Sequence, residues 1–139
     1  SREAMKIQVI LANYNNYPAI QKILNNRELF NYMSWERLIL LDEARKEKVK
    51  IDNQDVINFI SAHPLFQKNG TFDKKIYNAL LKNTLRIQPR EFEEYVRQNL
   101  KIRAVRQDIL KGITVSEKEI EDYYQKNFGT VECSYIIVD

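Results

Sequence analysis

The sequence contains few of the residues that interrupt helices. Its 139 residues include only three glycines and three prolines, and both types are unfavourable inside helices. Long uninterrupted elements are therefore expected. Hydrophobic residues make up 44% and charged residues 29%, which is ordinary for a globular domain and too apolar for a disordered chain. A chain of this length is predicted to form one domain with its own core.

Residues that commonly carry catalysis or bind metals are also scarce. The single cysteine, Cys133, excludes an internal disulfide and the usual cysteine-based metal sites. The single histidine, His63, precedes Pro64 at a predicted helix end and has no potential metal ligand at a suitable spacing. The glycines are too scattered for a phosphate-binding loop. We predict no catalytic residue, no metal site and no cofactor.

No apolar run approaches the length of a membrane span. The longest aliphatic run, residues 38–41, is far below the roughly 20 residues that a membrane helix needs, and no signal peptide is visible. The chain opens at Ser1 without an initiator Met, which is consistent with the removal of an upstream targeting segment.

An excess of charge of one sign is also missing. The net charge is only +3, and the most basic segment, residues 86–111, interleaves its cations with acidic residues. A nucleic-acid binder gathers its positive charge on one face, whereas mixed charge is typical of a solvated helix. A basic helical nucleic-acid-binding module is the alternative function, and a steep loss of binding with rising salt would distinguish it.

Apolar spacing predicts a series of helices. Residues 2–16 are predicted to form the first, although Ile7, Val9 and Leu11 alternate as they would in a strand. Pro18 suits the start of a long helix that reaches about residue 49, with an interruption at residues 25–26. Because this helix is apolar on nearly every side between residues 35 and 41, it is expected to be central to the core.

Capping and breaking residues set the later boundaries. N-cap side chains are expected at Asp52, Asp73 and Ser116, the last within a capping box. Helix ends are expected at Pro64 and Gly112, and residues 68–70 are a turn signal.

The tail, residues 131–138, is β-branched and aromatic and is the one predicted strand. The chain is therefore predicted to be mainly α: an irregular multi-helix module over residues 1–130, followed by a short C-terminal β-strand in residues 131–139. A lone strand leaves its backbone groups unpaired, so we expect it to mediate strand addition or a homodimer.

The apolar faces of successive helices predict a core and a binding surface. One shared core is expected to contain Leu38, Leu41, Phe59, Phe72, Tyr77, Leu80 and Phe92. Aromatic residues cluster near the N-terminus at Tyr14, Tyr17, Phe30, Tyr32 and Trp35. Of these, Tyr14, Tyr17, Phe30 and Tyr32 are the candidate polypeptide-binding residues, because exposed aromatic side chains form an adaptable apolar surface.

A specific motif occupies residues 64–77 and has the form P-x-F-Q-x-x-G-x-F-D-x-x-x-Y. Its residues are Pro64, Phe66, Gln67, Gly70, Phe72, Asp73 and Tyr77. The motif resembles that of the periplasmic and membrane-anchored folding factors of the PpiD/SurA type, and weaker similarity extends over nearly the whole chain. The motif also has a structural explanation, since Gly70 suits a tight turn and Asp73 a helix cap, so it identifies a fold and not a binding site.

The resemblance implies a SurA-like chaperone module that binds unfolded or newly exported polypeptides. It implies a periplasmic or other extracytoplasmic location and a parent protein with a membrane anchor upstream and a parvulin-type prolyl isomerase domain. These residues contain only one predicted strand of the parvulin sheet, so the chain itself is expected to lack isomerase activity. No nucleic-acid partner is expected.

Overall fold

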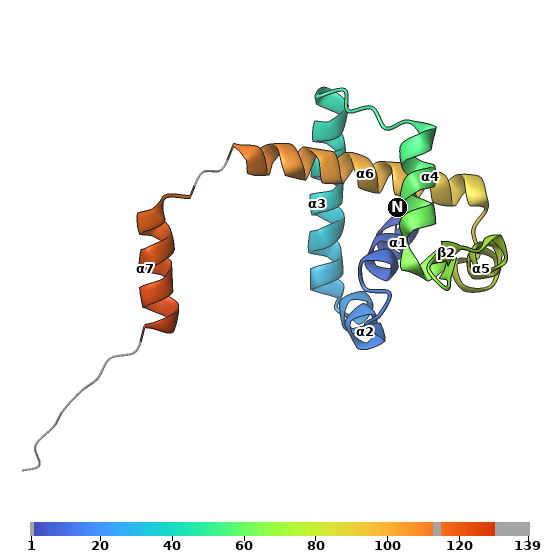
Figure 1. Cartoon of the computed structure of the whole chain (residues 1–139), viewed down its shortest axis with the longest axis horizontal. Helices are drawn as coiled ribbons and strands as arrows, with labels where there is room; N and C mark the ends of the chain where they lie inside the picture. The colour runs from blue at the N-terminus through green and yellow to red at the C-terminus, as the bar shows by residue number, and fades with distance from the viewer. Residues whose placement is uncertain (1, 113–114, 130–139) are drawn as a thin grey trace, which may run out of the picture. The chain divides into compact units, whose positions relative to one another are not determined.

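The computed structural model describes residues 2–112 and 115–129, which are almost entirely helical (Figure 1). The chain divides into two units, residues 1–108 and residues 109–139. The α-helices of the described chain are α1 (Arg2–Ala12), α2 (Tyr17–Asn25), α3 (Arg27–Lys46), α4 (Asn53–Ala62), α5 (Lys74–Ala79), α6 (Pro89–Lys111) and α7 (Glu117–Phe128). Four short elements lie between α4 and α6: the 3-10 turn η1 (Pro64–Phe66), the strands β1 (Gln67–Lys68) and β2 (Thr71–Phe72), and the π-helix η2 (Leu80–Leu85). The predicted mainly α fold is confirmed.

The helix boundaries lie where capping residues predicted them. Asp52 and Ser116 each form a capping box with the residue three positions later, and the Asp73 side chain accepts two backbone hydrogen bonds from the first turn of α5. Asn26 interrupts the long helix predicted after Pro18, because its side chain accepts a hydrogen bond from the N–H of Leu29 and starts α3.

The turn predicted at residues 68–70 closes a β-hairpin that the sequence did not predict. Strands β1 and β2 pair antiparallel, Gln67 with Phe72 and Lys68 with Thr71. The two residues of the loop, at positions 69 and 70, have positive φ values of 52° and 78°, as a type I′ hairpin turn requires. Strands of two residues are too short to show an alternating pattern, so the Asn-Gly turn is the only sequence signal for this hairpin.

Helix α1 is buried on two opposite sides. Met5 and Val9 belong to a smaller cluster with Ile20 of α2, whereas Ile7 and Leu11 belong to a larger cluster formed with residues of α4, η1, α5, η2 and α6. A helix turns by about 100° per residue, so positions 5 and 9 share one side and positions 7 and 11 share the other. The strand-like alternation of this segment arises because alternate residues serve opposite faces of a helix.

Three aromatic rings form the centre of the larger cluster. The rings of Phe66, Tyr77 and Phe92 lie 5.4 to 5.8 Å apart in edge-to-face arrangements, a favourable geometry for aromatic pairs. Phe66 and Phe92 are fully buried. Burial raises the pKa of Tyr77 to about 12, so its hydroxyl stays neutral. This aromatic group joins η1, α5 and α6.

The predicted shared core is correct in part. Four of its seven residues lie in or against the larger cluster, namely Phe59, Tyr77, Leu80 and Phe92. The prediction is wrong for Leu38 and Phe72, which have exposed fractions of 52% and 37%, and Leu41 lines a groove on the surface. Both residues of β2, Thr71 and Phe72, are exposed in the two-stranded hairpin.

The prediction that α3 is central to the core is also wrong. Ala44 and Arg37 are its only buried residues, while Trp35, Leu38 and Ile39 are exposed. Helix α3 contacts α1 and α2, and within residues 1–108 no element covers the face that carries Trp35 and Ile39. The run of apolar residues therefore faces solvent instead of the core.

The described part of residues 109–139 consists of the end of α6 and the helix α7. Every side chain of α7 is exposed, and the rings of Tyr123 and Tyr124 lie 6.4 and 5.6 Å from the ring of Phe128. The predicted strand, residues 131–138, and Cys133 within it lie outside the described residues. The homodimer expected from that strand stays a prediction.

His63, which follows α4, connects α1 to η1 through its two ring nitrogens. Its Nε2 lies 3.1 Å from the carbonyl oxygen of Leu11, and its Nδ1 accepts a hydrogen bond of 3.2 Å from the N–H of Leu65. Because a carbonyl only accepts, Nε2 carries the hydrogen and Nδ1 carries none. A helix C-terminus favours the charged imidazolium, but burial dominates and lowers the pKa of His63.

The aromatic centre predicts a contrast between two phenylalanines. Replacing the fully buried Phe92 by alanine should lower the free energy of unfolding by about 3–5 kcal/mol, as for other buried aromatic side chains. Phe72→Ala should cost clearly less, because Phe72 already contacts solvent. Urea unfolding of the two variants checks this, and equal losses would contradict the described core.

The neutral state of His63 predicts a dependence of stability on pH. Its pKa is lower in the folded than in the unfolded chain, so its contribution is complete above the unfolded value of about 6.5 and is lost as the pH falls through the folded value. Unfolding free energy measured from pH 7.5 to pH 5 should therefore fall more steeply for the native chain than for His63→Gln. Parallel curves would show that His63 titrates alike in both states.

Candidate functional site

The apolar side chains that α3 exposes most lie on one face of the helix. Tyr32, Trp35 and Ile39 have exposed fractions of 69%, 67% and 66%, and spacings of three and four residues place them in one row. A surface helix normally turns its apolar row toward the protein. A row that faces solvent instead indicates a surface available to a partner.

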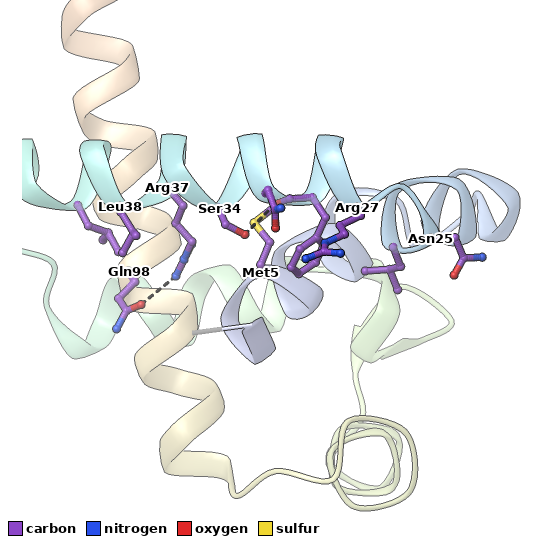
Figure 2. A pocket seen from close by; sticks show the side chains of 11 residues that line it. Met5, Asn25, Arg27, Ser34, Arg37, Leu38 and Gln98 are labelled. Carbon is purple, nitrogen blue, oxygen red and sulfur yellow. Dashed lines mark hydrogen bonds between the residues drawn. The ribbon is translucent and has the colours of Figure 1, made fainter.

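A groove lies beside this row, lined by α3, by α1 and α2, and by Gln98 of α6 (Figure 2). Its volume is about 790 Å³, and its apolar lining consists of Met5, Leu24, Phe30, Leu38 and Leu41. Leu38 lies three residues from Trp35 and is itself half exposed, so the apolar wall of the groove continues over its rim to the outer row. We refer to the row and the groove together as the α3 surface.

Arg37 is buried in the wall of the groove, with only 4% of its surface exposed. Its Nη1 donates to Gln8 Oε1 at 2.7 Å and to Asn99 Oδ1. Its Nη2 donates to Gln98 Oε1 at 2.8 Å (Figure 2). One guanidinium group thus joins α3 to α1 and α6. Burial lowers the pKa of Arg37, but an arginine retains its charge in a protein.

The acceptors around Arg37 are all neutral amides. None of the ion pairs in the described part of the chain involves Arg37, so its positive charge is solvated by side-chain dipoles and not balanced by a carboxylate. Arg27 contributes a second cation to the lining of the groove, which contains no acidic residue. The groove therefore combines apolar walls with a positive potential.

The four binding residues predicted from the sequence are not all brought together. Phe30 and Tyr32 are both on α3, where Phe30 lines the groove and Tyr32 belongs to the outer row. Tyr17 is exposed at the start of α2. Tyr14 is half-buried, and its ring packs edge-on against His63 at 5.1 Å. The Tyr14 side chain therefore packs inside the fold, whereas the other three side chains are at the surface or in the groove.

Sequence reasoning misses Trp35, Leu38 and Ile39 as parts of this surface, because the dense apolar run predicts burial. A signal was present in the spacing of Tyr32, Trp35 and Ile39, which marks one row. Periodicity identifies such a row, but it does not say whether another element covers it. That depends on tertiary packing.

The motif of residues 64–77 builds the fold and does not line the groove. Phe66 and Tyr77 are in the aromatic centre, and Gly70 forms the hairpin turn. Gln67 donates from Nε2 to the carbonyl of Ser61 at 2.8 Å and so attaches the hairpin to the end of α4. Pro64, Phe72 and Asp73 complete the motif at the start of η1, at the hairpin and at the cap of α5.

Metal-binding arrangements are not seen in residues 2–112 and 115–129. No group of three or more His, Cys, Asp or Glu side chains there could hold a metal ion. None of the described helices is both long enough and apolar enough to cross a membrane.

Comparison with known proteins gives a family for most of the chain. The model of the SurA-like N-terminal domain matches residues 20–106, which include α3, the motif and the part of α6 that contacts Arg37. No curated protein and no solved structure matches the chain.

The hydrogen bonds of Arg37 predict a cost for its removal. Arg37→Met keeps most of the buried volume but leaves three amide acceptors without their donor, and we expect it to lower the free energy of unfolding by about 1–3 kcal/mol. Arg90→Met, at an exposed position of α6, is the matched control and should change stability by less than about 0.5 kcal/mol. Similar losses in the two variants would show that Arg37 does not fasten α3.

Proposed function

The chain belongs to the family of SurA-like N-terminal domains, and from this membership we propose that it binds unfolded or newly exported polypeptides outside the cytoplasm. The family identifies a chaperone-type module. The observation that carries the proposal is the exposed row of Tyr32, Trp35 and Ile39 beside an open groove. No element of residues 1–108 covers the row.

The α3 surface has the properties that binding of unfolded chains requires. An unfolded segment offers apolar side chains in no fixed arrangement, so a suitable site offers apolar area without a closed, shape-specific pocket. Tyrosine and tryptophan supply such area with little loss of side-chain entropy. The row stands on a helix of 20 residues that Arg37 fastens to α1 and α6, so the backbone of the site is ordered before a client arrives.

The proposal includes the setting of the module. We propose a parent protein of the PpiD/SurA type that acts in the periplasm or another extracytoplasmic space. A parvulin-type prolyl isomerase domain and a membrane anchor would belong to that parent protein, beyond the residues of this chain.

We further propose that the module holds its clients without chemical change. Both ring nitrogens of His63 are occupied by backbone groups, which supports a structural role for this histidine. No specific observation favours the nucleic-acid alternative, because the outer row of α3 is apolar.

The proposal predicts a loss of chaperone activity when the row becomes polar. The triple variant Tyr32→Gln, Trp35→Gln, Ile39→Gln should suppress the aggregation of a client diluted from denaturant several-fold less well than the native chain. The reason is that it removes the apolar area that the client would bury. Light scattering during refolding of the client is the measurement.

A matched pair of single variants controls for general effects of polar substitution. Ile39 and Ile57 are both exposed isoleucines on helices, at 66% and 53%, but Ile57 lies on α4. Ile39→Gln should weaken suppression, and Ile57→Gln should leave it unchanged. Full activity in the triple variant, or equal effects of the two single variants, would contradict binding at the α3 surface.

A further inference from the structure

A second hollow follows the groove along α3. Its volume is about 510 Å³, and it shares Leu41 and Gln98 with the groove. The end of α3, the loop after it and the middle of α6 form its walls. We refer to it as the cationic hollow, because its lining includes Arg45, Lys48, Lys50 and Lys101 but only one acidic residue, Glu94.

Three of these cations have no anionic partner in the described part of the chain. None of its ion pairs involves Lys48, Lys50 or Lys101. Glu94 pairs instead with Arg97, at 3.4 Å. The positive charge of the hollow is therefore uncompensated, and it continues the positive potential of the neighbouring groove.

The end of α3 holds Lys48 in place. The N–H of Val49 donates to the carbonyl of Ala44 at 2.9 Å, and Lys48 has a φ of 54°, which together form a Schellman-type helix end. Glycine is the preferred residue at such a left-handed position, and a lysine is strained there. The hydrogen-bonded helix end fixes the backbone at Lys48, whose side chain lines the hollow.

We propose that the α3 surface prefers unfolded segments in which acidic residues adjoin apolar ones. This inference rests on the proposed function and names its substrate class. Apolar side chains of the client occupy the groove beside Leu38 and Leu41, and its carboxylates reach Lys48, Lys50 and Lys101. Residues 30–46 of α3 extend over about 24 Å at 1.5 Å per residue, which an extended client spans in about seven residues.

The lining of the two hollows favours a polypeptide over a nucleic acid. A nucleic acid carries a charge at every phosphate and binds along continuous cationic tracks. Here four cations line the cationic hollow, whereas the groove has two, Arg27 and the buried Arg37, among walls formed largely by Met5, Leu24, Phe30, Leu38 and Leu41. A client segment with separate apolar and acidic parts would place the apolar part in the groove and the acidic part in the cationic hollow.

Calorimetric titration with three capped ten-residue peptides tests the preference. All three contain the same leucine and phenylalanine residues, and they differ in three positions that are aspartate, asparagine or lysine. At low salt the aspartate peptide should bind roughly three- to tenfold more tightly than the asparagine peptide, because surface charge pairs contribute modestly. The lysine peptide should bind most weakly, and added salt should reduce the differences.

The variant Lys48→Gly tests the role of the lysine in binding without lowering the stability of the fold. Glycine relieves the backbone strain, so the variant should be at least as stable as the native chain, yet its preference for the aspartate peptide should shrink. Arg86→Gly is the matched control, because Arg86 also has a positive φ, of 56°, and also loses one charge. It should leave the preference unchanged.

The outcomes distinguish the two proposals. Equal binding of the aspartate and asparagine peptides would overturn the acidic preference and leave polypeptide binding intact. Binding of none of the peptides would overturn both. Tighter binding of a single-stranded deoxythymidine decamer than of the aspartate peptide would overturn the preference in favour of nucleic acid. Equal effects of Lys48→Gly and Arg86→Gly would show that the cationic hollow is not the site.

Discussion

Helix α1 connects the two hydrophobic clusters of residues 1–108. One of its sides contributes Met5 and Val9 to the smaller cluster, and the other contributes Ile7 and Leu11 to the larger one. An 11-residue helix is marginal by itself in water, so α1 is stable only because both sides are buried. The arrangement of the rest follows from this packing. The larger cluster assembles α4, the hairpin, α5 and α6 around an aromatic centre, and the smaller one attaches α2 and the start of α3.

The position of α3 at the margin of this core explains how an apolar surface remains exposed. Its contact with α6 depends on polar side chains, with Arg37 bonded to Gln98 and Asn99 and Arg106 paired with Glu36 at 2.7 Å. Beyond the start of the helix, polar contacts hold α3 in place without using Trp35, Leu38 or Ile39 for folding. These three side chains therefore remain available to a partner, although leaving them exposed to solvent forgoes the stability that their burial would give.

The two kinds of interaction that we propose for the α3 surface would suit different parts of chaperone action. Apolar contacts tolerate many client sequences because they are not directional. Under the proposed function, charges at the end of the groove would act over about 8 Å at physiological salt and would favour some clients during approach. A site that combines them would bind broadly, weakly and with a bias, which is the behaviour that a holding chaperone needs if it is also to release its clients.

The sequence by itself determined the helical class, the capping residues Asp52, Asp73 and Ser116, and the family motif, because these depend on contacts within a few residues. It did not determine which apolar residues are buried. The alternating residues of α1 are buried on both sides, whereas the denser run at Trp35, Leu38 and Ile39 is exposed. Only the tertiary structure decided this, since periodicity shows that a helix has an apolar face but burial depends on whether a distant segment packs against it.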